Sequence, residues 1–137
     1  DRRLNQIPLM LSVTLDAGGN RTQGGQTLFE FWNSVKRTRP FAVGINCSFG
    51  ARGMVPALTQ LARVSDTWVS WRPSAGVPDP AGQYEEQPTE TASLAREAAQ
   101  QGLLNIVGGC CGTSPEHIRE ITNAVADISP RRLTTDG

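Results

Sequence analysis

The sequence has no apolar run approaching the roughly 18 residues that a membrane-spanning helix needs. It also lacks a basic-then-apolar stretch of the kind that begins a secretory protein. Its 13 basic and 13 acidic residues cancel, and neither sign forms a block, so the electrostatic footprint of a nucleic-acid-binding protein is absent. We therefore expect a cytoplasmic protein that binds neither membranes nor nucleic acid.

Histidine and cysteine are scarce, with one His and three Cys among 137 residues. An odd number of cysteines without a secretory signal argues against a disulfide framework and favours thiol chemistry or metal binding. The length allows one domain at most and is small for a barrel enzyme. Because the chain begins at Asp1 rather than Met, we interpret it as a fragment or a processed product.

Four apolar, β-rich runs each precede a helical pattern, which predicts the order βαβαβαβα. The runs are nearly continuously apolar, as in strands buried on both faces of a parallel sheet. The predicted strands are residues 7–15, 41–47, 67–71 and 103–107. The predicted helices are marked by residues 28–35, 54–61, 89–101 and 115–128, with Pro56 in the first turn of the second and Ser114 capping the fourth.

Four such units are half of a (β/α)₈ barrel. A free-standing four-stranded sheet would leave two apolar edges unpaired, which native proteins avoid. We infer that about four βα units lie upstream, or that the chain pairs with itself or with another chain. Two linkers, residues 16–26 and 72–88, leave the C-terminal ends of strands, where α/β folds place their sites.

The three cysteines fall at the ends of predicted strands, and we expect them on one rim of the sheet. Cys47 ends the second strand, and Cys110 and Cys111 follow the fourth. Adjacent residues of a strand point to opposite faces, so Cys110 and Cys111 converge only if the chain bends there. The glycines that permit this bend are Gly108, Gly109 and Gly112.

Three thiolates at about 2.3 Å from Zn²⁺, with a fourth position left to water or substrate, form a catalytic rather than a closed structural site. Such a site is net negative, so it suits a bound sulfur that must stay electron-rich. Zinc deprotonates a bound thiol at neutral pH and leaves it able to attack a methyl carbon. The alternatives are cysteines that serve as small buried hydrophobic residues, or a redox pair of Cys110 and Cys111, whose ring would be strained.

Three segments resemble a known family, the zinc-dependent homocysteine S-methyltransferases. They are residues 44–47, residues 73–84 with their Ser-Ala-Gly-Val-Pro and Gly-Gln-Tyr, and residues 105–117 with Gly-Gly-Cys-Cys-Gly-Thr. Residues 12–15 and 25–27 look like the branch that contains the homocysteine-binding domain of cobalamin-dependent methionine synthases. The resemblance extends from about residue 7 to residue 133.

The resemblance implies that residues 1–137 are a partial homocysteine-binding domain, βα units 5–8 of a (β/α)₈ barrel whose N-terminal half is absent. It implies an enzyme with zinc on Cys47, Cys110 and Cys111 that transfers methyl from methylcobalamin to homocysteine, giving methionine. The methylcobalamin is carried by another domain and regenerated from 5-methyltetrahydrofolate, so the implied partners are homocysteine, the cobalamin- and folate-binding domains, and the missing half-barrel. The alternatives are betaine or S-methylmethionine as the donor, or an inactive zinc-binding half-barrel module.

Asn46, Ser74 and Gly109 are the candidates for contacts with the substrate. The family usually has Asn where this chain has Ser74, and in related enzymes that Asn can occupy the fourth position on zinc before substrate binds. The resemblance implies that Ser74 leaves this role to water.

Three further kinds of side chain are expected to be structural. The only histidine, His117, falls in the first turn of an amphipathic helix and is expected on its surface. Glu85 and Glu86 are expected to be solvated loop charges rather than an acid–base pair. The tryptophans Trp68 and Trp71 are expected to pack in the core, or to lie at an edge beside a missing strand.

Overall fold

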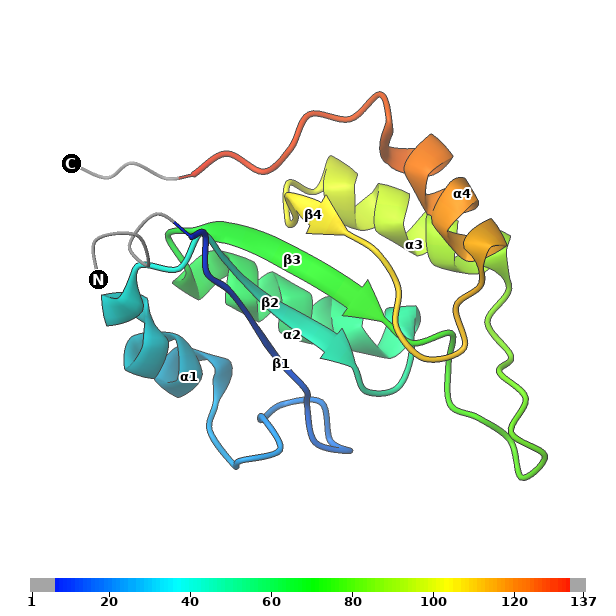
Figure 1. Cartoon of the computed structure of the whole chain (residues 1–137), viewed down its shortest axis with the longest axis horizontal. Coiled ribbons are helices and arrows are strands. Elements are labelled where there is room, and N and C mark those ends of the chain that lie inside the picture. Colours follow the sequence, from blue (N-terminus) through cyan, green and yellow to red (C-terminus); the bar gives the residue numbers. More distant parts are fainter. Residues whose placement is uncertain (1–6, 134–137) are drawn as a thin grey trace.

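A computed structural model describes residues 7–133, so the expectation drawn from Asp1 lies outside the described residues. One sheet contains four strands in the order β1-β2-β3-β4, and each strand is parallel to its neighbour (Figure 1). The strands are β1 (Met10–Val13), β2 (Ala42–Cys47), β3 (Trp68–Pro73) and β4 (Ile106–Val107). The predicted α/β class and strand order are confirmed, although β1 and β4 are shorter than the apolar runs that predicted them.

The helices alternate with the strands and form one layer, in which α1 contacts α2, α2 contacts α3, and α3 contacts α4. Figure 1 shows α2 behind the sheet and the pair α3 and α4 beside β4. The helices are α1 (Leu28–Val35), α2 (Ala51–Val64), α3 (Pro88–Gln100) and α4 (Pro115–Val125), with the 3₁₀ turn η2 (Lys36–Thr38) after α1. Among the described residues, no helix is long and apolar enough to cross a membrane.

Local signals explain where the helices begin and end. Thr27 caps α1, because its hydroxyl accepts from the Glu30 N–H while the Glu30 carboxylate accepts from the Thr27 N–H. Ser114 caps α4 as predicted. The prediction for Pro56 was wrong: α2 begins at Ala51, so Pro56 lies in its second turn and on its exposed side, where the ring removes one helical hydrogen bond without entering the core.

The two faces of the sheet differ in what covers them. Val43 and Ile45 of β2 alternate with Ala42 and Gly44, since successive strand residues point to opposite faces. The first pair belongs to the hydrophobic core shared with the helices. On the other face Gly44 lies opposite Ser70 of β3, and a Cβ on Gly44 would collide with Ser70.

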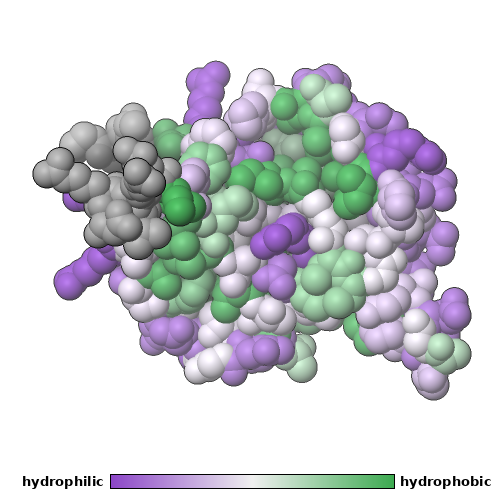
Figure 2. Space-filling view, in the orientation of Figure 1, coloured by the Kyte–Doolittle hydropathy of each residue, from purple (hydrophilic) through white to green (hydrophobic). Residues whose placement is uncertain are grey.

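That second face, which we call the uncovered face, carries exposed hydrophobic groups. Trp68 is 41% exposed and Met10, in register with it across β2, is 45% exposed. Trp71, on the helix side, is fully buried. The core prediction is therefore right for Trp71 and wrong for Trp68, whose indole packs against Phe41 with ring centroids 4.9 Å apart. Figure 2, drawn in the orientation of Figure 1, shows hydrophobic residues on the surface of the molecule.

Within residues 7–133 the sheet is open at both ends of its strand order, because β1 pairs only with β2 and β4 only with β3. In a closed barrel these two edges would have partners, and the uncovered face would line the barrel interior. The parallel order, the single helix layer and the uncovered face are together consistent with half of a (β/α)₈ barrel.

The chain after α4 returns to the start of β3 and is fastened there by Arg131. The guanidinium donates to the carbonyl oxygens of Ser65 (2.7 Å), Ala62 (2.8 Å) and Thr67 (2.9 Å). The Arg131 N–H donates to the Leu104 carbonyl at 3.1 Å. Burial of the guanidinium lowers the pKa of Arg131. One side chain thus satisfies the carbonyls at the end of α2, where a cation also interacts favourably with the helix dipole.

Candidate metal centre

The three cysteines meet at the C-terminal edge of the sheet. Cys47 is the last residue of β2, and Cys110 and Cys111 lie just beyond β4. The sulfur of Cys111 is 3.6 Å from that of Cys47 and 3.9 Å from that of Cys110, and all three sulfurs lie within 4.8 Å of one another. All are free thiols; Cys47 and Cys110 are half-buried and Cys111 is exposed. The structure therefore brings together the residues predicted to share a rim.

The backbone at Cys47 is strained. Cys47 has φ 61° and the next residue, Ser48, has φ 68°, so two consecutive non-glycine residues are left-handed. Each such residue costs on the order of 1–3 kcal/mol and persists only where its surroundings hold it. The Ser48 hydroxyl provides one such restraint, since it accepts from the Leu15 N–H at 3.1 Å. This conformation turns the chain sharply out of β2 at the first ligand candidate.

Among the glycines expected to bend the chain at Cys110 and Cys111, only Gly112 has a positive φ, of 75°. Gly109 is needed for space, because a Cβ there would collide with the Thr113 side chain. Thr113 closes the turn: its N–H and its hydroxyl both donate to the Cys110 carbonyl, at 3.2 and 2.6 Å. The predicted role of Gly109 in substrate binding stays a prediction.

The loop from Ser74 to Gln87, which we call the β3–α3 loop, is bonded to the cysteine segment. The Ala75 N–H donates to the Cys111 carbonyl at 2.9 Å, and the Cys110 N–H donates to the Pro73 carbonyl at 2.9 Å. The Ser74 hydroxyl is buried, accepts from the Gly50 N–H at 3.1 Å and donates to the Gly76 carbonyl at 3.0 Å. Ser74 thus has a structural use in the described chain, and its predicted contact with substrate stays a prediction.

Asn46, the other candidate for substrate binding, lies next to Cys47 and is half-buried. Its side-chain oxygen accepts from the Ser12 hydroxyl at 2.5 Å, and its amide group donates to the Thr14 hydroxyl at 3.5 Å. These contacts join the ends of β1 and β2 beside the cysteines. A role for Asn46 toward substrate stays a prediction.

Two side chains expected at the surface instead join three elements. His117 is 7% exposed, so its predicted surface position was wrong. Its Nδ1 accepts from the Ser114 N–H at 3.1 Å, and its Nε2 donates to the Glu86 carbonyl at 2.9 Å. The Glu86 carboxylate accepts from the Ala51 N–H at 3.0 Å, where the α2 dipole favours negative charge. Glu86 is therefore not a solvated charge, whereas Glu85 is exposed as expected.

Tyr84 is a site residue that the sequence reasoning missed. It is half-buried in the β3–α3 loop, and its ring lies against Gly112, where a Cβ would fall within the ring. Burial raises the pKa of Tyr84, and the neighbouring thiols of Cys111, Cys47 and Cys110 raise it further. The signal was present in the Gly-Gln-Tyr segment that contributed to the family resemblance.

The Cys47 thiol ionises less readily than an ordinary cysteine. Burial, followed by the neighbouring thiols of Cys111 and Cys110, raises the pKa of Cys47 to about 11. Cys47 is therefore protonated at neutral pH when no cation is present. Sulfurs arranged tetrahedrally at about 2.3 Å from zinc lie about 3.8 Å apart, which matches the two closer separations of 3.6 and 3.9 Å. The donor set fits a zinc ion.

A shallow cavity of about 420 Å³ opens beside Cys47. Asp16 and Gln23 of the glycine-rich linker, Phe49 after β2 and Val77 of the β3–α3 loop line it together with Cys47. Polar and apolar groups thus border one side of the sulfur cluster, and a small molecule can approach from this side.

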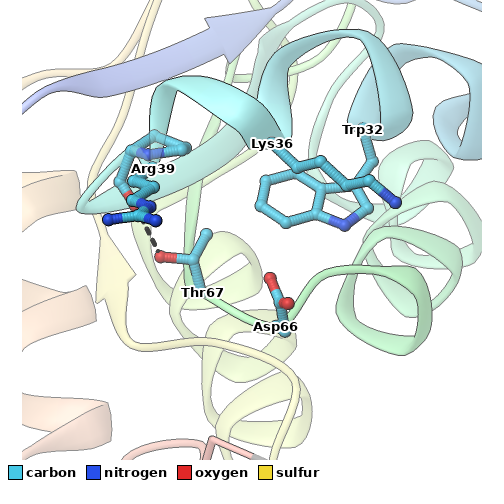
Figure 3. A pocket seen from close by; sticks show the side chains of 6 residues that line it. Trp32, Lys36, Arg39, Asp66 and Thr67 are labelled. Carbon is cyan, nitrogen blue, oxygen red and sulfur yellow. Dashed lines mark hydrogen bonds between the residues drawn. The ribbon is translucent and has the colours of Figure 1, made fainter.

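A second cavity, of about 400 Å³, lies at the opposite edge of the sheet (Figure 3). The indole of Trp32 forms one wall, Lys36 begins η2 and Arg39 follows it, and Asp66 and Thr67 precede β3. Because these residues are at the N-terminal ends of the strands, the cavity is separate from the cysteines.

Comparison with known proteins agrees with the geometry. The sequence profile described as homocysteine S-methyltransferase matches residues 1–125. The chain belongs to the homocysteine S-methyltransferase family. Its fold is similar to that of the homocysteine methyltransferase MmuM from Escherichia coli in its oxidised form, with a TM-score of 0.57 and 22% identity. The match covers 77% of this chain but 32% of the E. coli protein, so the chain spans about a third of the length of that homocysteine methyltransferase.

Proposed function

We propose that this chain is the zinc-binding, C-terminal half of a homocysteine S-methyltransferase barrel, comprising βα units 5–8. The observation that carries the proposal is the convergence of Cys47, Cys110 and Cys111 at the C-terminal rim of a parallel sheet. In (β/α)₈ enzymes that rim holds the active site. Membership of the family and the spacing of the three sulfurs both support this function.

The chain's own residues hold the site in shape. Zinc, when bound, supplies the positive charge that keeps a substrate thiol deprotonated at neutral pH. The three cysteines supply three negative charges, so the sulfur of the substrate stays electron-rich and able to attack a methyl carbon. Glu86 and His117 fix the β3–α3 loop against α2 and α4, and the backbone of this loop is bonded to Cys111.

The open sheet supports a partner half-barrel. We propose that four further βα units pair with β1 and β4 and cover the exposed Met10 and Trp68. Those units would also supply contacts to the amino acid part of homocysteine, together with Asn46 and Ser74 at the near rim.

The methyl donor is proposed to be methylcobalamin held by a separate domain and regenerated from 5-methyltetrahydrofolate. The support is the resemblance of residues 12–15 and 25–27 to the methionine synthase branch. Competing donors are betaine and S-methylmethionine. The three donors are distinguished by assays of the barrel completed with its N-terminal half, given each donor in turn. We expect methionine to form from methylcobalamin alone. Turnover with betaine or S-methylmethionine instead would contradict the assignment.

Zinc binding provides the direct test. With all thiols reduced, we expect one zinc ion per chain, and each of the variants Cys47→Ser, Cys110→Ser and Cys111→Ser should weaken binding at least about 100-fold, since a thiolate ligand is lost. Glu85→Gln, which removes an exposed carboxylate from the adjoining loop, is the matched control and should bind as tightly as the parent chain. Absence of stoichiometric zinc, or Cys110→Ser with full affinity, would overturn the proposal.

A further inference from the structure

Both neighbours of Cys47 in the chain are tied to the end of β1. Before it, the Asn46 side chain is bonded to the hydroxyl groups of Ser12 and Thr14. After it, the Ser48 hydroxyl is bonded to the backbone of the residue that follows Thr14. The first ligand candidate is thus held from both sides, while its own sulfur meets the cysteine segment beyond β4.

The Ser48 hydroxyl makes two hydrogen bonds that together close the left-handed turn. It accepts from the Leu15 N–H at 3.1 Å and donates to the Asn46 carbonyl at 3.3 Å. The register of β1 and β2 ends at the pair Val13 and Ile45, so the hydroxyl extends the contact between the strands past their last paired residues. Both of its partners precede the turn in the sequence, and one side chain therefore ties the turn to the strands on which it stands.

The backbone at Ser48 would suit glycine better than serine. Its φ of 68° is left-handed, a conformation that glycine adopts without steric cost. Cys47 is equally left-handed but supplies a sulfur, whereas Ser48 is not among the ligand candidates. Strained residues persist only where their surroundings hold them, and they gather at functional sites. What serine adds at this position, and glycine lacks, is the hydroxyl group with its two bonds.

We propose that Ser48 is a positioning residue of the metal centre, whose hydroxyl group fixes the turn that brings the Cys47 sulfur to 3.6 Å from the Cys111 sulfur. The proposal rests on the metal site of the proposed function. Ser48 acts through the backbone that it shares with Cys47. Groups behind the ligands govern metal affinity because they hold the ligands in place. Without the two bonds, the turn relaxes and the Cys47 sulfur moves away from its partner, so metal binding has to restore it.

Two substitutions remove the hydroxyl group and treat the backbone differently. Ser48→Ala keeps a Cβ and the strain that goes with it, whereas Ser48→Gly relieves the strain. Loss of the hydroxyl is the change that both variants share. Ser34→Ala, which removes an exposed hydroxyl on α1, is the matched control.

Cobalt(II) is the probe, because its bonds to thiolates give charge-transfer absorption bands that zinc lacks. The 137-residue chain and its variants are titrated with cobalt(II) under reducing, oxygen-free conditions in which circular dichroism shows that each chain is folded. Urea denaturation of the metal-free chains measures stability separately. Affinity for the metal and stability of the fold are thereby read independently.

We expect Ser48→Ala and Ser48→Gly each to bind cobalt(II) about 10-fold more weakly than the parent chain, the lower end of the range for residues that support ligands, and Ser34→Ala to bind as the parent does. A role in stability alone would move the urea midpoint and leave the affinity of the folded chain unchanged. Parental affinity in either Ser48 variant would therefore overturn the proposal. A parent chain that binds no cobalt(II) would instead overturn the metal site itself, so the two failures are distinguishable.

Discussion

Replacing Arg131 with methionine tests how the C-terminal segment is fastened to the rest of the fold. The guanidinium donates to three carbonyl oxygens, those of Ala62, Ser65 and Thr67, at 2.7–2.9 Å. Methionine has a comparable length and no donor, so Arg131→Met removes these bonds while it retains most of the packing. The carbonyls at the end of α2 would then lose their partners.

The expected loss follows from the number of bonds. A hydrogen bond to a charged group contributes about 1.5–3 kcal/mol, so three bonds at the lower end correspond to about 4.5 kcal/mol. The desolvation of the buried cation, which also lowers the pKa of Arg131, offsets part of this contribution. We therefore expect Arg131→Met to lower the free energy of unfolding by about 3 kcal/mol.

Urea denaturation followed by tryptophan fluorescence measures this difference. Arg132→Met is the matched control, because Arg132 is the exposed neighbour of Arg131 and its replacement should change stability by less than about 0.5 kcal/mol. Arg131→Lys keeps the charge but not the fork of donors, and should fall between the parent and Arg131→Met. A loss below about 1 kcal/mol in Arg131→Met would refute the reasoning, since it would mean that water replaces the guanidinium at little cost.

Three further outcomes follow from the site. Gly112→Ala should lower zinc affinity at least about 10-fold, measured by competition with a chelator. A φ of 75° strains alanine, and the added methyl group would displace Tyr84. Unchanged affinity would contradict the close packing of Tyr84 against Gly112. In the metal-free protein the pKa of Cys47 is higher in the folded chain than in the unfolded chain, so the thiol of the unfolded chain ionises at lower pH. The free energy of unfolding should therefore fall as pH rises from about 9 to about 11. Cys47→Ser should abolish this decline. His117→Ala should lower the unfolding free energy by about 1–2 kcal/mol through loss of its bonds to Glu86 and the α4 cap; thermal unfolding that does not change would count against that link.

The elements were predictable because their signals are local. The capping residue Ser114 is next to the helix that it begins. The apolar run at residues 41–47 matches β2 except for its first residue. The shared rim of the cysteines follows from strand direction alone, since parallel strands end at the same edge. The resemblance to the family came from short segments near these strand ends.

The errors concern contacts between distant segments. His117 and Glu86 are 31 residues apart, and nothing in the local pattern around either residue shows that they bond to each other. Trp68 was misplaced for a different reason: a large aromatic residue in a strand is usually buried, but none of the described helices lies over its side of the sheet. The left-handed backbone at Cys47 also has no local signal, because neither it nor Ser48 is glycine or asparagine.

At the strained turn of Cys47, the residue that would stabilise the fold most differs from the residue that the proposed metal site needs. Glycine would adopt φ of 61° without penalty, so selection for a more stable fold alone would favour glycine there. Only cysteine supplies the sulfur that meets Cys111. Variants selected only for folding would therefore lose cysteine at position 47. Variants selected for metal binding would keep it, although their fold is less stable.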